Sequence, residues 1–182
     1  MLSMIYQQSE HAYEAESDLK TVRTLITYIK NMMLTEEEIL EPDEIAELKI
    51  TVIYKDYCRQ LRAKGLMDHD DQMVYAYTML RSVPELLRHF QELYPYICVD
   101  EAQDTSKIQH AIIALLASGS ENLFMVGDED QSIYGFRAAY PEALLTFEKN
   151  YPDAKVLLME ENFRSDARIV LAADRFIQKN TL

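Results

Sequence analysis

The sequence predicts an α/β fold, in which an N-terminal all-helical subdomain leads into part of a parallel sheet with crossover helices. Two observations support this. The first 92 residues show only helical periodicity, whereas three short apolar runs alternate with helical stretches after Tyr94. Such alternation is typical of parallel strands joined by helices. With 182 residues, 48% of them hydrophobic, the chain can form a core plus a subdomain. We place the helical subdomain at residues 1–66 and the α/β part at residues 67–182.

The helical half is predicted element by element from apolar spacing. Residues 8–33 form a first helix, because apolar side chains recur on one face at the 3.6-residue period: Leu19, Val22, Leu25, Ile26 and Ile29. Thr35 can cap a short helix, Pro42 suits the first turn of another, and residues 43–64 continue helically until Gly65. Residues 67–82 form the next helix, with acids at its start, and a further short helix begins near Pro84.

The second half alternates strands and helices. The runs YICV, NLFMVGD and KVLLME are predicted strands beginning near residues 96, 122 and 155. A helix capped by Thr105 or Ser106 follows the first run, and a helix over 141–150 follows the second. Ser165 is predicted to cap a last helix that runs through Lys179.

Charge and cysteine content narrow the function classes. The formal net charge is -13 and neither half is basic, so charge alone argues against nucleic-acid binding. Cys58 and Cys98 are interpreted as two buried reduced thiols, since they show no metal-ligand spacing and a disulfide is the less favoured alternative. No apolar stretch reaches membrane-spanning length and no signal peptide is visible, which predicts a cytoplasmic protein.

The stretch YICVDEAQDTS places two acids at a predicted strand end. In parallel α/β sheets, ligands bind at the carboxyl ends of strands, and Asp100, Glu101 and also Asp128 follow such ends. An Asp held there can ligate Mg²⁺, and a neighbouring Glu can take a proton from an attacking water. The alternative is structural, with the acids capping the helix that starts near Thr105.

A second unusual stretch is MVGDEDQSIYGFRAA, residues 125–139. It combines acids, a glutamine, two aromatic residues and an arginine after the second apolar run. Tyr134 and Phe136 beside Arg137 form a plausible stacking surface for nucleic-acid bases, and Gln131 suits a phosphate or water contact. The alternative is that both rings fill the core beneath this loop.

Together, VDEAQDTS, VGDEDQSIYGFRAA and LMEENFRS resemble the second, third and fourth motifs of UvrD/Rep-type superfamily 1 DNA helicases, in order and at suitable spacing. GLMDHDDQMVYAYTML is similar to the family's segment where the helical 1B insertion returns to the 1A core, with His69 replacing a usual Phe. The resemblance covers about residues 50–180. It implies a partial RecA-like sheet, the core of P-loop NTPases, that uses ATP and Mg²⁺.

The resemblance also implies roles for individual residues. Asp100 matches the Mg²⁺-associated acid, and Glu101 matches the general base for water. Gln131 matches the glutamine that senses the γ-phosphate, and Arg164 matches the arginine that reaches this phosphate. The remaining matches are Gln103 and Phe163 for the nucleotide, and Tyr134, Phe136 and Arg137 for DNA.

The sequence departs from the family pattern at three positions within these motifs. Phe136 replaces a common Trp, which keeps a stacking face of smaller area, and Gly135 replaces a frequent Arg. Phe163 replaces the usual Tyr that stacks on adenine, so the ring is kept and the hydroxyl is lost. For Arg164, the alternative to a phosphate contact is an ion pair with a nearby acid: Glu160, Glu161 or Asp166.

The phosphate-binding loop of this family is missing from the 182 residues, since no Gly-x-x-x-x-Gly-Lys-Ser/Thr pattern occurs. The expectation is therefore an internal segment of an ATP-dependent DNA helicase or translocase that is inactive alone. Its expected partners are single-stranded or partly duplex DNA and the rest of the helicase, namely the phosphate-loop part of 1A and the 2A and 2B domains. No membrane partner is expected. The alternative is a catalytically inactive helicase-like interaction module, although Asp100, Glu101, Gln131 and Arg164 are all present.

Overall fold

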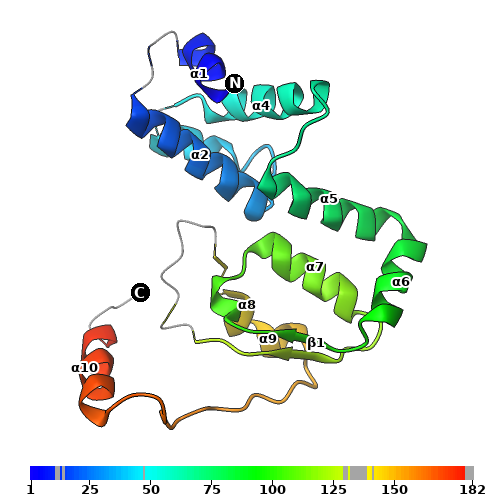
Figure 1. Cartoon of the computed structure of the whole chain (residues 1–182), viewed down its shortest axis with the longest axis vertical. Coiled ribbons are helices and arrows are strands. Elements are labelled where there is room, and N and C mark those ends of the chain that lie inside the picture. The colour runs from blue at the N-terminus through cyan, green and yellow to red at the C-terminus, as the bar shows by residue number, and fades with distance from the viewer. Residues whose placement is uncertain are drawn as a thin grey trace.

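The structure, a computed structural model, describes residues 1–10, 13, 15–46, 48–128, 131, 139–140 and 142–178. Helices come first and strands alternate with helices afterwards, which confirms the predicted mixed α/β character (Figure 1). In chain order the elements are α1 (Leu2–Glu10), α2 (Glu16–Asn31), α3 (Leu40–Ala46), α4 (Ile50–Ala63), α5 (His69–Ser82), α6 (Pro84–Leu93), β1 (Ile97–Val99), the 3-10 helix η1 (Ala102–Asp104), α7 (Lys107–Ala117), β2 (Leu123–Met125), α8 (Glu142–Leu145), α9 (Phe147–Asn150) and α10 (Ala167–Ile177).

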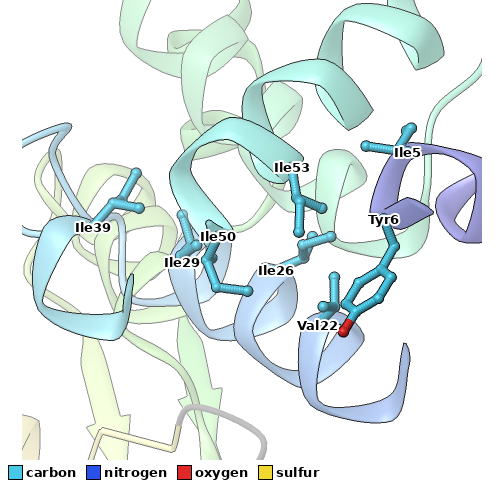
Figure 2. Close-up of a cluster of buried hydrophobic side chains, with 8 residues drawn as sticks. All are labelled: Ile5, Tyr6, Val22, Ile26, Ile29, Ile39, Ile50 and Ile53. Carbon is cyan, nitrogen blue, oxygen red and sulfur yellow. The ribbon is translucent and has the colours of Figure 1, made fainter. Parts of the chain in front are cut away.

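Helices α1, α2 and α4 enclose a core built mainly from isoleucine, which Figure 2 shows in close-up. Apolar side chains at helical spacing point from each helix toward the other two, as the 3.6-residue period predicts. We call residues 1–63, which contain α1 to α4, the helical region. Its buried cluster consists of Ile5, Tyr6, Val22, Ile26, Ile29, Ile39, Ile50 and Ile53.

Two of the predicted helices are each divided in the structure. The predicted helix over 8–33 is wrong at its start, because α1 ends at Glu10 and α2 begins at Glu16. The backbone N–H of Ala15 donates to the Asp18 carboxylate at 3.1 Å, which starts α2. The predicted helix over 43–64 is wrong at residues 48–49, where α3 gives way to α4. There the Thr51 N–H donates to Asp43 Oδ1 at 2.7 Å, so a side chain satisfies a backbone donor of the new helix.

A buried ion-pair cluster joins α2 to the start of α5. Lys30 Nζ donates to Asp68 Oδ2 and to Asp71 Oδ1, at 2.7 Å each. Asp68 is also the N-cap of α5 and accepts from the Asp71 N–H at 2.8 Å. Burial alone would lower the pKa of Lys30, but the two carboxylates raise the pKa to about 12. A further carboxylate, Asp70, accepts from Thr27 and Asn31 of α2, so the junction is polar and fully hydrogen-bonded at these groups.

Strands β1 and β2 form a two-stranded parallel sheet, as predicted. Ile97 pairs with Leu123, Cys98 with Phe124 and Val99 with Met125. Helix α7 connects the strands, and α5 and α6 pack against α7. The other face of the sheet is open, because Cys98 is exposed and Phe124 is 58% exposed. The prediction of two buried thiols is therefore wrong for Cys98, and Cys58 is only half-buried, although both cysteines are free.

The third predicted strand, KVLLME, is wrong in the structure. Residues 155–160 have no strand assignment, and the side chains of Val156, Leu157, Leu158 and Met159 are all exposed. A strand needs a hydrogen-bonding neighbour, and this run pairs with neither described strand. The last helix, α10, begins after Asp166, whose carboxylate accepts from the Arg168 N–H, so Asp166 rather than Ser165 is its N-cap.

Candidate active site

The two acids of the YICVDEAQDTS stretch lie directly beyond β1, as predicted. Asp100 and Glu101 are exposed, and Asp100 Oδ1 accepts from the Glu101 N–H at 2.9 Å. Glu101 has a backbone φ of +49°, in the left-handed region that favours glycine. A non-glycine residue held in that region costs on the order of 1 kcal/mol, and such strain is concentrated at functional sites. The bend after β1 turns the chain into η1 while both carboxylates stay accessible to solvent.

Gln103 is the centre of a hydrogen-bond chain that links the ends of the two strands. Its side chain is almost fully buried, with 1% of the residue exposed. Gln103 Nε2 donates to Glu101 Oε2 at 2.7 Å, and Gln103 Oε1 accepts from the Asp128 N–H at 3.1 Å. A buried amide that is satisfied at both ends is costly to replace, so it fixes the positions of its neighbours. Gln103 thereby links Glu101, which lies beyond β1, to Asp128, which lies beyond β2.

Gln131 continues this chain. Its Nε2 donates to Asp128 Oδ2 at 2.6 Å, and its backbone N–H donates to the Asp128 carbonyl at 3.0 Å. Four polar residues therefore form one connected set, in the order Glu101, Gln103, Asp128 and Gln131. The structure thus brings together four residues that the sequence singled out, and Asp128 links Gln103 to Gln131.

Gly127 makes the close approach of β2 to Gln103 possible. A Cβ at this position would lie 2.7 Å from Leu144 Cδ1 and 2.9 Å from Gln103 Oε1. Both distances are shorter than a Cβ normally tolerates, so any larger residue would displace the side chain of Leu144 or Gln103. Two features of the sequence point to Gly127, since it is one of only four glycines and directly follows an apolar run.

The segment after η1 holds the far end of the loop that follows β2. The Tyr140 N–H donates to the Thr105 carbonyl at 2.9 Å, and Ser106 forms an isolated bridge with Ala139. Of the two caps that the sequence predicted, Thr105 or Ser106, the structure has Ser106 as the N-cap of α7, and Gln109 completes the capping box. Both ends of the stretch from Asp128 to Ala139 are thus attached to the segment that carries the acids.

Two further side chains beside this segment were not predicted. Asp104 Oδ1 is buried and has no hydrogen-bond partner among the described residues. His110 contacts the Thr105 hydroxyl through Nε2, and burial lowers the pKa of His110 below its usual value. His110 also lines a small cavity of about 290 Å³ between α7, β2 and α9, whose other walls are largely apolar.

The remaining predicted site residues are not joined to this set. Phe163 is 90% exposed and Arg164 is exposed, and no described contact connects either of them to Asp100, Glu101 or Gln131. The backbone N–H of Arg164 donates to Asn162 Oδ1 at 3.0 Å. Within the described residues, Arg164 forms no ion pair with Glu160, Glu161 or Asp166. The predicted DNA-facing residues Tyr134, Phe136 and Arg137 lie outside the described residues.

The donor set at the end of β1 is suited to a hard divalent cation. Two adjacent exposed carboxylates supply the oxygen ligands that Mg²⁺ prefers, and they leave room for water and phosphate oxygens to complete an octahedron. Within the described residues no group of three potential ligands occurs, so protein side chains alone would not enclose a metal ion here. Mg²⁺–nucleotide sites in proteins commonly take part of their coordination from substrate phosphates and water.

Residues 1–152 match the UvrD/REP helicase N-terminal domain. This chain belongs to the UvrD/Rep helicase family. It is 40% identical over 157 residues to the ATP-dependent DNA helicase PcrA of Staphylococcus epidermidis, and 39% identical over 157 residues to the PcrA of Staphylococcus aureus. Each comparison covers 86% of this chain and 22% of the relative. The chain thus spans about a fifth of the length of the curated relatives it matches.

The UvrD/Rep match covers the acids, Gln103, Asp128, Gln131 and the loop that follows β2. The match ends before Phe163 and Arg164. These two residues also have no described contact with the connected set of Glu101, Gln103, Asp128 and Gln131. In the part of the chain that the structure describes, no helix has the length and apolar character needed to cross a membrane.

Proposed function

We propose that this chain is the part of an ATP-dependent DNA helicase that carries the acids for Mg-ATP hydrolysis and the loop that couples ATP to DNA. The observation that carries the proposal is the hydrogen-bond chain from Glu101 through Gln103 to Asp128 and Gln131. A proton acceptor for water and a polar group for the terminal phosphate must move together if hydrolysis is to be coupled to motion. A buried amide that connects them meets this requirement.

Within this proposal each residue has a distinct task. Asp100 is the ligand for Mg²⁺, which neutralises phosphate charge when it is bound. Glu101 accepts a proton from the attacking water, and Gln103 holds its carboxylate in place through the bond to Oε2. Gln131 contacts the γ-phosphate and passes its position to the stretch from residue 132 to 138.

The outlying residues complete the proposed site in the full-length protein. Arg164 is proposed to neutralise the developing charge on the transferred phosphoryl group, because a planar and permanently charged guanidinium suits that role. Phe163 is proposed to stack on adenine, and Tyr134, Phe136 and Arg137 to contact single-stranded DNA. In the proposed architecture, residues 67–182 are the C-terminal part of a RecA-like 1A domain, and residues 1–66 form a 1B-like helical subdomain. The 182 residues hold no phosphate-loop pattern, so we expect them to be inactive alone.

The proposal is tested by Glu101→Gln in a protein of full family length. The substitution removes the proton acceptor but keeps the side-chain shape and the polar contact to Gln103. We expect Mg-nucleotide binding to persist while turnover falls by about 10²–10⁴-fold. The measurements are nucleotide affinity and the steady-state rate of ATP hydrolysis with saturating single-stranded DNA.

A matched control is Glu121→Gln. Glu121 is also an exposed glutamate at positive φ, +54°, but it lies in the turn before β2 and makes no contact with the connected set. This variant should hydrolyse ATP at the wild-type rate. If Glu101→Gln stays within a few-fold of wild type, Glu101 serves only the local turn and the proposed role is incorrect.

A further inference from the structure

His110 lies in the first turn of α7 and is half-buried beside the segment that carries the site acids. Its Nε2 contacts the Thr105 hydroxyl, and its ring meets the Tyr140 ring edge-on at a centroid distance of 6.4 Å. Tyr140 is attached a second time, because its N–H donates to the Thr105 carbonyl at 2.9 Å. His110 therefore lies where the end of η1 meets the far end of the stretch that begins at Asp128.

The geometry around Thr105 fixes which ring nitrogen of His110 carries the proton. The Thr105 hydroxyl has a single hydrogen, and Oγ1 donates it to the Ala102 carbonyl at 2.6 Å. The same oxygen must then accept from His110, so Nε2 is the protonated nitrogen. Burial lowers the pKa of His110, and hydrogen bonding to the Ala102 backbone opposes that shift only in part. The neutral ring has one N–H, which is directed at the end of η1.

The segment that this N–H reaches carries the group that orients Glu101. Ala102 begins η1, is fully buried, and donates its N–H to the Val126 carbonyl at 2.9 Å. Gln103 follows, and its side-chain amide holds the Glu101 carboxylate. Thr105 closes η1, because its N–H and its hydroxyl both donate to the Ala102 carbonyl. A 3-10 helix this short has few hydrogen bonds of its own, so a shift at its closing residue would move Gln103 and the carboxylate with it.

We propose that His110 is a positioning residue for ATP hydrolysis, which holds η1 through Thr105 and thereby keeps the Glu101 carboxylate in place. The proposal rests on the hydrolytic role proposed above for Glu101 and adds a residue that acts on it only through its neighbours. A displacement of about 1 Å at a reacting group can cost about 100-fold in rate, so a remote hydrogen bond can matter for turnover. If His110 only filled space beside Tyr140, its ring would suffice and its N–H would make no difference.

The test compares His110→Phe with His110→Gln in a protein of full family length. Phenylalanine keeps a ring beside Tyr140 and removes the donor, whereas glutamine removes the ring and keeps an N–H donor on a side chain of similar reach. The control is His89→Phe, which makes the same change at an exposed histidine on α6 whose ring contacts Phe90. The measurements are kcat and KM for ATP with saturating single-stranded DNA, the melting temperature, and hydrogen exchange at the amides of residues 102–105.

We expect His110→Phe to lower kcat by about 10–100-fold while KM for ATP stays within about twofold of wild type, because the loss falls on the reacting geometry rather than on nucleotide binding. Exchange at residues 102–105 should become faster in the same variant. His110→Gln should recover most of the turnover and of the protection, and His89→Phe should match wild type.

A wild-type kcat in His110→Phe overturns the proposal, as does an equal loss of kcat in His110→Gln. A fall in kcat that comes with a lower melting temperature and unchanged exchange at residues 102–105 also overturns it, because the effect would then be general destabilisation. A wild-type protein that does not hydrolyse ATP would instead contradict the proposed function. The exchange rates of the two His110 variants would still decide whether His110 holds η1.

Discussion

The helical region and the sheet region bury their side chains to very different extents. In the helical region, eight apolar side chains form one closed cluster. In the sheet region, residues 94–178, few of the described residues are buried, and they are mostly small or polar: Ala102, Gln103, Ser106, Ile108 and Ala117. Parallel sheets are normally covered on both faces. The comparison teaches that the helical region supplies its own core, whereas the sheet region presents apolar surfaces suited to further packing.

Buried polar groups do not separate the two regions. In the helical region, Lys30 is satisfied by Asp68 and Asp71, but Thr51 Oγ1 is buried without a hydrogen-bond partner among the described residues. In the sheet region, Gln103 is satisfied, and Asp104 Oδ1 is buried without a partner in the same way. The larger buried apolar cluster should therefore make the helical region the more stable part of the 182-residue chain. Four substitutions can break or sharpen this comparison.

The largest effect is expected from Lys30→Met. Removing the ammonium leaves Asp68 and Asp71 facing each other without a cation, and breaking a buried pair in this way costs about 3–5 kcal/mol. The free energy of unfolding should fall by that amount in urea titrations of the 182-residue chain. Lys55→Met removes one partner of an exposed pair and should cost no more than about 1 kcal/mol. Equal losses in the two variants would show that burial of the Lys30 cluster does not strengthen the helical region.

The pH dependence of stability separates the charge of Lys30 from its packing. The folded-state pKa of Lys30 is raised to about 12 from a usual value of 10.5. Its contribution should be complete below pH 10.5 and should disappear as the pH rises toward 12. Wild type should therefore lose stability over this interval more steeply than Lys30→Met does. Parallel curves for the two proteins would contradict this assignment.

The next effect is expected from Ile53→Ala. Ile53 is fully buried in the helical cluster, and truncating such a side chain costs about 2–5 kcal/mol through lost transfer energy and an unfilled cavity. Ile53→Val should cost about 0.5–1.5 kcal/mol, which provides a graded control. Urea unfolding followed by circular dichroism measures both. If Ile53→Ala lowered the free energy of unfolding by less than the loss of about 0.5–1.5 kcal/mol expected for Ile53→Val, the cluster would not be the main source of stability in the helical region.

A smaller effect is expected from Gly127→Ala in the sheet region. The added Cβ would approach Leu144 and Gln103 Oε1 too closely, so overpacking should cost about 1–3 kcal/mol. The same change should loosen the hydrogen bond from the Asp128 N–H to Gln103, which hydrogen exchange at this amide can detect. Gly119→Ala is the control, because its Cβ would meet only the flexible Gln91 side chain. Unchanged exchange at Asp128 would show that Gly127 is not required for the close approach.

The sequence predicted well where one local pattern decides the structure. Acids at a helix start located α5, Pro84 located α6, and an apolar run followed by polar residues located β1 and β2. The divisions between α1 and α2 and between α3 and α4 were missed, because bonds such as that from the Thr51 N–H to Asp43 redirect the chain without changing its apolar period. At the site, the acids and Gln131 were named correctly as neighbours of the strand ends. The link through Gln103 could not be read from the sequence, since it depends on how the segments after β1 and β2 approach each other.

The smallest effect is expected where the sequence prediction failed, in the run from Val156 to Met159. A strand was predicted there from its apolar composition, but composition does not supply a neighbouring strand. Leu158 is 78% exposed, so Leu158→Ser removes almost no buried surface. The free energy of unfolding of the 182-residue chain should change by less than about 0.5 kcal/mol, as for other exposed positions. The same substitution in a protein of full family length provides the contrast, because there further segments can pack on the run. If Leu158→Ser destabilises the 182-residue chain by as much as Ile53→Ala does, the run is already packed in solution and the sheet region is more complete than the structure shows.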